Sequence, residues 1–135
     1  MGPGRELTVR WRDEQVFEGG ASGKPVILVD GKGAEATSPV ELLLLAAATC
    51  SATDVVLILQ KQRVALKSLE FRVQGTRRDT APRCYTSIHF DVALSGDGAD
   101  EAKARRAIDL SIEKYCSVLA SLRPDISVTY DVVIR

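Results

Sequence analysis

Within one long run near the middle of the chain, residues 38–63, the part over residues 40–59 is apolar almost all round. Glu41 and Asp54 are its only charged residues before the last three positions. A helix that is apolar on every side is typical of a protein interior. A membrane span is disfavoured, because Asp54 lies well inside the run and would be costly in lipid. We therefore predict a long buried central helix.

The beginning of this run carries the signals of a helix N-terminus. Ser38 can cap the helix, and Pro39 suits its first position. Glu41 follows the serine by three residues, which is the spacing of a capping box. Because neither proline nor glycine recurs before Gly75, nothing in the run ends the helix early.

Apolar and polar residues alternate with a period of two on both sides of this helix, which is typical of half-buried strands. In the first such segment Leu7, Val9 and Trp11 form the apolar face. A second helix is predicted over residues 100–122, where apolar side chains recur at steps of three and four. The predicted strands cover residues 5–12, 15–18, 25–30, 66–77, 84–94 and 126–134.

The glycine-rich segments 19–23, 31–33 and 95–98 are predicted turns. The order is therefore three strands, helix, two strands, helix, strand, with the first three strands as a meander. Grouped strands and helices indicate an α+β fold with an antiparallel or mixed sheet, in a single domain over residues 1–135. A helix that is apolar all round needs more cover than one such sheet provides, so we expect a homodimer with this helix at its interface.

The charge balance narrows the possible partners. Lysine and arginine number 18, as do aspartate and glutamate, so the net charge is zero. This balance argues against a nucleic-acid partner and against binding to a charged membrane surface. The N-terminal residues show no secretory signal, and three cysteines without one indicate a reducing compartment, which we expect to be the cytoplasm.

Cys50 lies near the middle of the predicted central helix, with small neighbours on its face and Asp54 one helical turn further on. The small neighbours would let a substrate approach the thiol. The same spacing suits a small buried hydrophobic residue, so both interpretations stand. A reactive thiolate would need a cation from elsewhere, because Asp54 is negative and the helix N-terminus is distant. Candidates for this cation are Arg10, Arg12 and Lys24.

The other two cysteines and the histidine differ in their expected roles. Cys116 faces inward on the second predicted helix, so it either fills the core or pairs with Cys50 across two packed helices. Cys84 shares the inward face of its strand with apolar residues, which indicates a structural role. His89, the only histidine, is interpreted as a solvated strand residue. A structural zinc is not expected, because no two cysteines stand at the short spacing of a metal site.

Two segments of the chain resemble the OsmC/Ohr family, the osmotically inducible and organic-hydroperoxide-resistance proteins. The first is SPVELLLLAAATCSATDVV, residues 38–56, with a cysteine eleven residues after the proline, and the second is EKYCSV, residues 113–118. The residues of these two segments are most similar to the YhfA-like branch of the family. The predicted order of strands and helices matches that of the family over nearly the whole chain. The resemblance implies an OsmC-like fold in an intertwined homodimer with active sites at the subunit interface.

The resemblance also implies a thiol peroxidase that needs no cofactor. Cys50 falls on the peroxidatic position, whose thiolate would attack an organic hydroperoxide and become a sulfenic acid, and Cys116 falls on the resolving position. A dithiol reductant, lipoyl-type in the Ohr branch, would restore both thiols. Val40 stands where the Ohr pattern has its active-site glutamate, with Glu41 one residue later, and Arg12 is a candidate for the arginine of that pattern.

Three hypotheses of function follow. The first, which we favour, is a cytoplasmic thiol-dependent peroxidase that reduces organic hydroperoxides in oxidative-stress defence. In it Cys50 and Cys116 are catalytic, with support from Glu41, Asp54 and Arg12, and no metal, nucleic acid or membrane takes part. The second, favoured by the shifted glutamate, is a non-enzymatic redox-sensing or apolar-ligand-binding dimer of the same fold. The third is a dimeric structural protein with buried cysteines.

Overall fold

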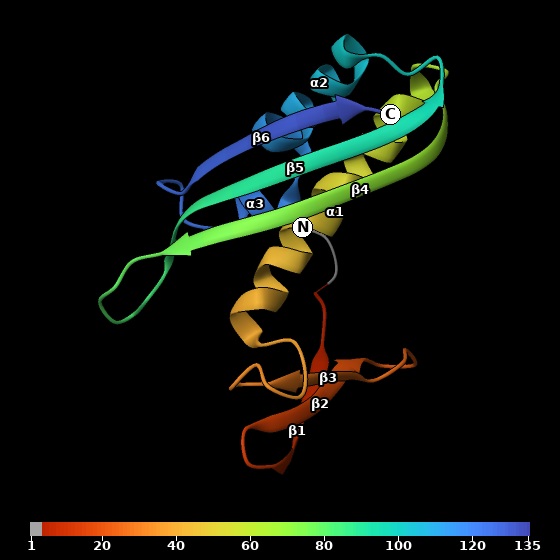
Figure 1. Cartoon of the computed structure of the whole chain (residues 1–135). Coiled ribbons are helices and arrows are strands. Elements are labelled where there is room, and N and C mark those ends of the chain that lie inside the picture. Colours follow the sequence, from red (N-terminus) through yellow and green to blue (C-terminus); the bar gives the residue numbers. More distant parts are fainter. Residues whose placement is uncertain (1–3) are drawn as a thin grey trace. The chain divides into compact units, whose positions relative to one another are not determined.

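The computed structural model describes residues 4–135 and shows an α+β chain with two small sheets and one long helix (Figure 1). The chain divides into two compact units, one ending at Leu43 and the other beginning at Leu44. This boundary falls inside the long helix α1 (Pro39–Lys61). The single domain over residues 1–135 stays a prediction.

The first unit contains an antiparallel meander of three short strands, as predicted, with β2 in the middle. The apolar face of the first strand is not half-buried as predicted, because Leu7, Val9 and Trp11 are between 62% and 70% exposed. Alternation gives this strand two distinct faces, but the described residues of its own unit cover the apolar face only in part. The strands are β1 (Leu7–Asp13), β2 (Val16–Ala21) and β3 (Ile27–Asp30).

Two strands continue through glycines that the sequence indicated as turns. β2 extends through Gly19, and β5 (Tyr85–Asp97) extends through Gly96. A Cβ atom on Gly19 would lie 2.6 Å from the Thr8 carbonyl oxygen of β1, and one on Gly96 would meet the backbone of Ala65 on the neighbouring strand. At both positions, glycine therefore allows two backbones to approach closely instead of ending the strand.

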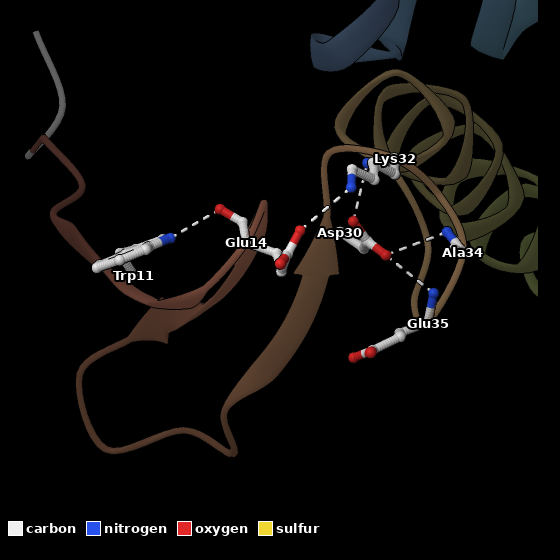
Figure 2. A network of polar contacts seen from close by, with 6 residues as sticks. All are labelled: Trp11, Glu14, Asp30, Lys32, Ala34 and Glu35. Carbon is white, nitrogen blue, oxygen red and sulfur yellow. Dashed lines mark hydrogen bonds and ion pairs between the residues drawn. The ribbon is translucent and has the colours of Figure 1, made fainter.

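A buried carboxylate orders the loop that leads from β3 to α1 (Figure 2). Asp30 is 3% exposed, and its Oδ1 accepts a hydrogen bond from the backbone N–H of Lys32 at 2.8 Å. Its Oδ2 accepts from the N–H groups of Ala34 and Glu35 at 3.1 and 2.9 Å. These donors, with Glu35 first and Lys32 next, hold the pKa of the Asp30 carboxyl below its usual value.

Two exposed contacts involve Glu14, in the turn between β1 and β2, and one of them joins this turn to the same loop (Figure 2). Trp11 Nε1 donates to the carbonyl oxygen of Glu14 at 2.9 Å, and the Glu14 carboxylate pairs with Lys32 Nζ at 3.3 Å. The two side chains of this ion pair are 73% and 55% exposed. Solvent therefore screens the pair, and it contributes little to stability.

Helix α1 begins with the predicted capping box. The N–H of Ser38 donates to Glu41 Oε1 at 3.0 Å, and the N–H of Glu41 donates to Ser38 Oγ at 3.3 Å. These hydrogen bonds from Ser38, the backbone one first, lower the pKa of the Glu41 carboxyl. The glutamate thus closes the first turn of the helix, as the spacing of the two residues indicated.

Within the single chain, α1 buries one face, whereas the sequence predicted burial on all sides. Its buried residues recur at steps of three and four, while Leu45 and Leu57 are 50% and 53% exposed. Among the described residues, α1 is the one helix long and apolar enough to cross a membrane, a property that core helices share. The buried residues of α1 are Ala47, Ala48, Ser51, Val55 and Leu59.

The second unit is a sheet of three strands with helices on one of its faces (Figure 1). The strand order is β4-β5-β6, in which β4 runs antiparallel and β6 parallel to β5. Ile88, Phe90 and Leu94 of β5 are fully buried, as predicted, in one core cluster with the buried face of α1. The two outer strands are β4 (Ala65–Arg77) and β6 (Ser127–Ile134).

The second helix, which forms the crossover between the parallel strands β5 and β6, is not continuous over residues 100–122 as predicted. The N–H of Cys116 donates to the carbonyl oxygen of Ser111 at 2.8 Å, and Cys116 itself is extended, with φ −71° and ψ 106°. A bond that spans five residues widens the helix by one residue, a change that an apolar repeat does not reveal. The crossover consists of α2 (Glu101–Leu110), the π-turn η1 (Ser111–Tyr115) and α3 (Ser117–Ala120).

Asp30→Asn should loosen the loop before α1, because an amide nitrogen would replace an oxygen that accepts backbone N–H groups. We expect faster hydrogen exchange at these amides and a lower melting temperature near neutral pH. Since the folded-state pKa is depressed, the contribution of the carboxylate is present above the ordinary pKa of 3.8 and is lost as the pH falls through the folded value. The difference in melting temperature should therefore shrink on acidification.

Glu14→Gln is the matched control for this prediction. It removes an exposed ion pair from the same network, so exchange and melting temperature should stay close to those of the wild type. Unchanged amide exchange in Asp30→Asn would contradict the role assigned to the carboxylate.

Candidate functional site

A buried serine hydroxyl links α1 to the π-turn of the crossover. Ser111 Oγ lies 2.8 Å from Asp54 Oδ2 and 2.9 Å from Ser51 Oγ, and both serines are fully buried. A hydroxyl carries one proton, and a carboxylate only accepts, so Ser111 donates to Asp54 and can accept from Ser51. Each polar group of this bridge thereby has a partner inside the protein, as buried polar groups require.

The bridge positions the two cysteines that the sequence singles out. Ser51 directly follows Cys50 on α1, and Asp54 stands one helical turn further on. The carbonyl oxygen of Ser111 accepts from the N–H of Cys116 at 2.8 Å. The bridge therefore fixes the backbone beside each thiol.

The structure brings the thiols of Cys50 and Cys116 together. Cys116 is 3% exposed, whereas Cys50 is half-buried. Burial, the largest cause, raises the pKa of the Cys116 thiol to about 11, and the hydrogen bond and charge interaction with Cys50 act in the same direction. The backbone N–H of Leu119, 3.5 Å from the sulfur, opposes this increase. At neutral pH the Cys116 thiol therefore keeps its proton.

Two free thiols in contact can be oxidised together to a disulfide, provided that one of them is reached by an oxidant. Cys50 and Cys116 are both free, and they differ in access. The less buried Cys50 is the sulfur that a molecule from outside can approach. The buried, protonated Cys116 can then react with its oxidised neighbour.

A cavity of about 480 Å³ opens one helical turn from Cys50. Asp54 lines this cavity together with the apolar side chains of Leu57 and Ile58 and the cationic side chain of Arg106. Lys61 and Gln62 also line it, so the cavity joins an apolar part to a polar, largely cationic part. The lining of this cavity thus suits an organic compound with a polar end.

The remaining residues predicted to support the site belong to the first unit. Glu41 is held in the capping box of α1, and Arg12 is exposed on β1. The structure thus brings Cys50, Cys116 and Asp54 into one site. The support expected from Glu41 and Arg12 stays a prediction.

Cys84 and His89 have more contacts than the sequence indicated. Cys84 lies just before β5, half-buried, and its sulfur is 3.6 Å from Arg123 Nη1. His89 faces outward from β5 as predicted, but two carboxylates contact it, so it is not merely solvated. The structural role predicted for Cys84 stays a prediction.

Ser51 and Ser111 are the residues of the site that the sequence analysis did not single out. Each stands at an inward position of a helix that is otherwise apolar on that side. A buried hydroxyl needs a hydrogen-bond partner, and Asp54 is the one charged residue in the middle of the central run. This combination was the available signal for a polar bridge between the two helices.

Ser111→Ala should destabilise the protein by about 1–3 kcal/mol, because Ser51 and Asp54 lose their partner inside the protein. Urea unfolding measures this loss. Ser121→Ala is the matched control, since its exposed hydroxyl bonds only the carbonyl oxygen of Ser117 in its own helix, and it should cost less than about 0.5 kcal/mol. Equal stability of the two variants would show that the bridge contributes nothing.

Sequence comparison places the chain among known proteins. Residues 31–131 match the family model described as OsmC-like protein. Protein YhfA of Escherichia coli is 41% identical over 131 residues, and the match covers 95% of this chain and 98% of that protein.

Structural comparison agrees. A hypothetical protein from Aquifex aeolicus superposes with a TM-score of 0.86 at 29% identity, and the match covers 99% of each chain. The organic hydroperoxide resistance protein OhrB of Bacillus subtilis superposes with a TM-score of 0.63 at 14% identity, over 96% of this chain and 98% of that chain, which shows a shared fold. As the sequence predicted, this chain belongs to the OsmC-like protein family and has its fold.

Proposed function

We propose that this protein is a cytoplasmic thiol-dependent peroxidase that reduces organic hydroperoxides, with Cys50 as the peroxidatic and Cys116 as the resolving cysteine. The observation that carries the proposal is the contact between these two thiols, one on α1 and the other at the break of the crossover. Membership of the OsmC-like family supports it. Further support comes from proteins of the same fold that bear the name organic hydroperoxide resistance protein.

The reaction would take place in two steps on the protein. The Cys50 thiolate attacks the hydroperoxide, the O–O bond breaks, and the alkoxide leaves and takes up a proton to become an alcohol, while Cys50 becomes a sulfenic acid. The sulfur of Cys116 then attacks the sulfur of Cys50. The hydroxide that leaves combines with the Cys116 proton as water, and a disulfide remains. An external dithiol, such as a lipoyl compound, would reduce this disulfide by thiol–disulfide exchange.

The protonated state of Cys116 suits the resolving role. Its raised pKa, about 11, keeps the thiol neutral while Cys50 is reduced, and burial is the largest cause of this increase. A neutral thiol does not repel the Cys50 thiolate, and it can donate a hydrogen bond to it. The proton that Cys116 holds is also the one that the leaving hydroxide requires in the second step.

The cavity beside Asp54 would take the organic part of the substrate. Leu57 and Ile58 contribute apolar surface there, one helical turn from the peroxidatic thiol. Apolar lining favours an organic hydroperoxide over hydrogen peroxide, because only the former gains from leaving water. Arg106 provides a positive charge in the same cavity.

We also propose that the active form is a homodimer with α1 at its interface. Leu45 and Leu57 lie on the part of α1 that its own unit leaves about half exposed, at 50% and 53%. The strand β1 exposes a further row of large apolar side chains. Exposed large apolar side chains, on either unit, are typical of a protein–protein interface.

Light scattering should therefore give about twice the chain mass of 14.6 kDa. Leu57→Lys should shift the protein towards the monomer, because a charge buried at an apolar interface is costly. Gln60→Lys is the matched control on an exposed position of the same helix and should leave the mass unchanged. A monomeric mass for the wild type would contradict the proposed dimer.

Apolar-ligand binding without turnover is the second candidate function, and one cavity in the first unit favours it. This cavity, of about 370 Å³, has an almost wholly apolar lining that includes Leu7, Phe17, Val29 and Leu42. Val40 in place of the glutamate of the Ohr pattern agrees with a fold that binds or senses without rapid catalysis. A hydrophobic molecule that copurifies with a protein lacking peroxidase activity would support this second function.

Steady-state reduction of cumene hydroperoxide with excess dihydrolipoamide tests the peroxidase proposal. Cys50→Ser should lose all measurable turnover, because no thiolate remains to attack the peroxide. When dihydrolipoamide is left out, Cys116→Ser should consume about one equivalent of peroxide per chain and stop at the sulfenic acid, with no disulfide formed. Cys84→Ser is the matched control, since its thiol takes no part in the proposed reaction, and it should turn over like the wild type. Turnover by Cys50→Ser at the wild-type rate would overturn the assignment.

A further inference from the structure

A second cluster of reactive side chains lies on the outer face of the β4-β5-β6 sheet. His89 Nε2 is 3.2 Å from Asp91 Oδ1 and 3.3 Å from Asp131 Oδ2. Among residues 4–135 these form the one group of three metal-ligating side chains whose ligand atoms all lie within 4.8 Å of one another. The proposed peroxidase reaction uses none of them.

The strands themselves hold these side chains in place. His89 and Asp91 are two residues apart on β5, so they point to the same face of the sheet. Asp131 stands directly opposite Asp91 in the parallel pair of β5 and β6, and Thr129 stands opposite His89. The β5 residues on either side of His89 are fully buried in the core, which anchors the backbone beneath the cluster.

The cluster gathers two carboxylates around one imidazole nitrogen. Two carboxylates that stand directly opposite one another on neighbouring strands repel, and His89 lies between them. His89 Nδ1 is 2.7 Å from Thr129 Oγ1, an arrangement that directs Nε2 at both carboxylates. On the other side of β5, Arg72 stands opposite Asp91 and Gln74 opposite His89.

We propose that His89, Asp91 and Asp131 bind a divalent transition-metal ion, for which Zn²⁺ is the best match. One imidazole nitrogen and two carboxylate oxygens are ligands that zinc accepts, each at about 2.0–2.2 Å. Ligand atoms at that distance lie about 3.3–3.6 Å apart around a tetrahedral ion and about 2.8–3.1 Å apart around an octahedral one. The two spacings from Nε2, 3.2 and 3.3 Å, fall within the span of these two geometries.

The ion would link β6 to β5 and keep part of its coordination open. Three protein ligands leave at least one position for water or for an external anion. The Asp131 side chain is 78% exposed, so such a molecule can reach the site. Thr129 would orient the imidazole, as hydrogen-bond partners of metal-binding histidines do.

Zinc titration by calorimetry tests the proposal. The protein used for it carries serine in place of the cysteines at positions 50, 84 and 116, because thiolates would otherwise bind the ion. One ion should bind per chain. His89→Gln and Asp131→Asn should each weaken binding more than about tenfold, and Thr129→Val by about tenfold, since it removes only the orienting partner. Asp79→Asn, an exposed aspartate in the turn between β4 and β5, is the matched control and should bind as the parent protein does.

Cobalt spectra of the wild-type protein give a second readout that needs no cysteine variant. Co²⁺ at the proposed site should add visible d–d bands of nitrogen and oxygen ligation, which are distinct from any charge-transfer band of a thiolate, and Asp131→Asn should lose these d–d bands. Absence of saturable zinc binding in the serine protein, equal affinity in His89→Gln, or a cobalt spectrum of thiolate type alone would overturn the proposal. The cluster would then be an imidazolium held between two carboxylates.

Discussion

Ser111 donates its hydroxyl proton to Asp54 and lies 2.9 Å from Ser51, so one buried side chain joins the central helix to the crossover between β5 and β6. The same residue accepts, through its carbonyl oxygen, the N–H of Cys116. Its side chain therefore fixes the position of the crossover on α1, and its backbone fixes the end of the π-turn. The contact between the Cys50 and Cys116 thiols depends on both.

Burial differs between the two thiols. Cys116 has almost no contact with solvent, and its pKa, raised to about 11, keeps it protonated at neutral pH. Cys50 stands on a helix face that is only partly covered within the chain. A peroxidase with two cysteines requires this asymmetry, because the substrate must reach one sulfur and the second must react only afterwards. The extended backbone at Cys116 places its thiol between two short helical segments instead of inside a continuous helix.

The elements that depend on local pattern could be predicted from the sequence. The capping box of Ser38 and Glu41, the inward residues of β5 and the three-stranded meander all follow from spacing or alternation. The break at Cys116 could not be predicted, because the apolar repeat continues on both sides of the π-turn. The exposure of Leu7, Val9 and Trp11 could not be predicted either, because alternation defines an apolar face but does not show what covers it.

The sequence motifs indicated Cys50 and Cys116, but they did not indicate the residues that hold the backbone beside these cysteines. Ser51 and Ser111 are 60 residues apart in the chain, and neither carries a local signature of a contact. A hydrogen bond between such distant residues depends on how the helices pack, which a single sequence does not fix. The same limit applies to His89 and Asp131, whose pairing requires β6 to lie parallel to β5.

The most direct test of the central claim, that Cys50 and Cys116 form one redox couple, is a thiol count with intact mass on reduced protein. One equivalent of cumene hydroperoxide is added, and the free thiols are then titrated under denaturing conditions. We expect the number of free thiols per chain to fall from three to one, and the mass of the chain to fall by two hydrogens. The remaining thiol should be that of Cys84. Three thiols and an unchanged mass would contradict this claim.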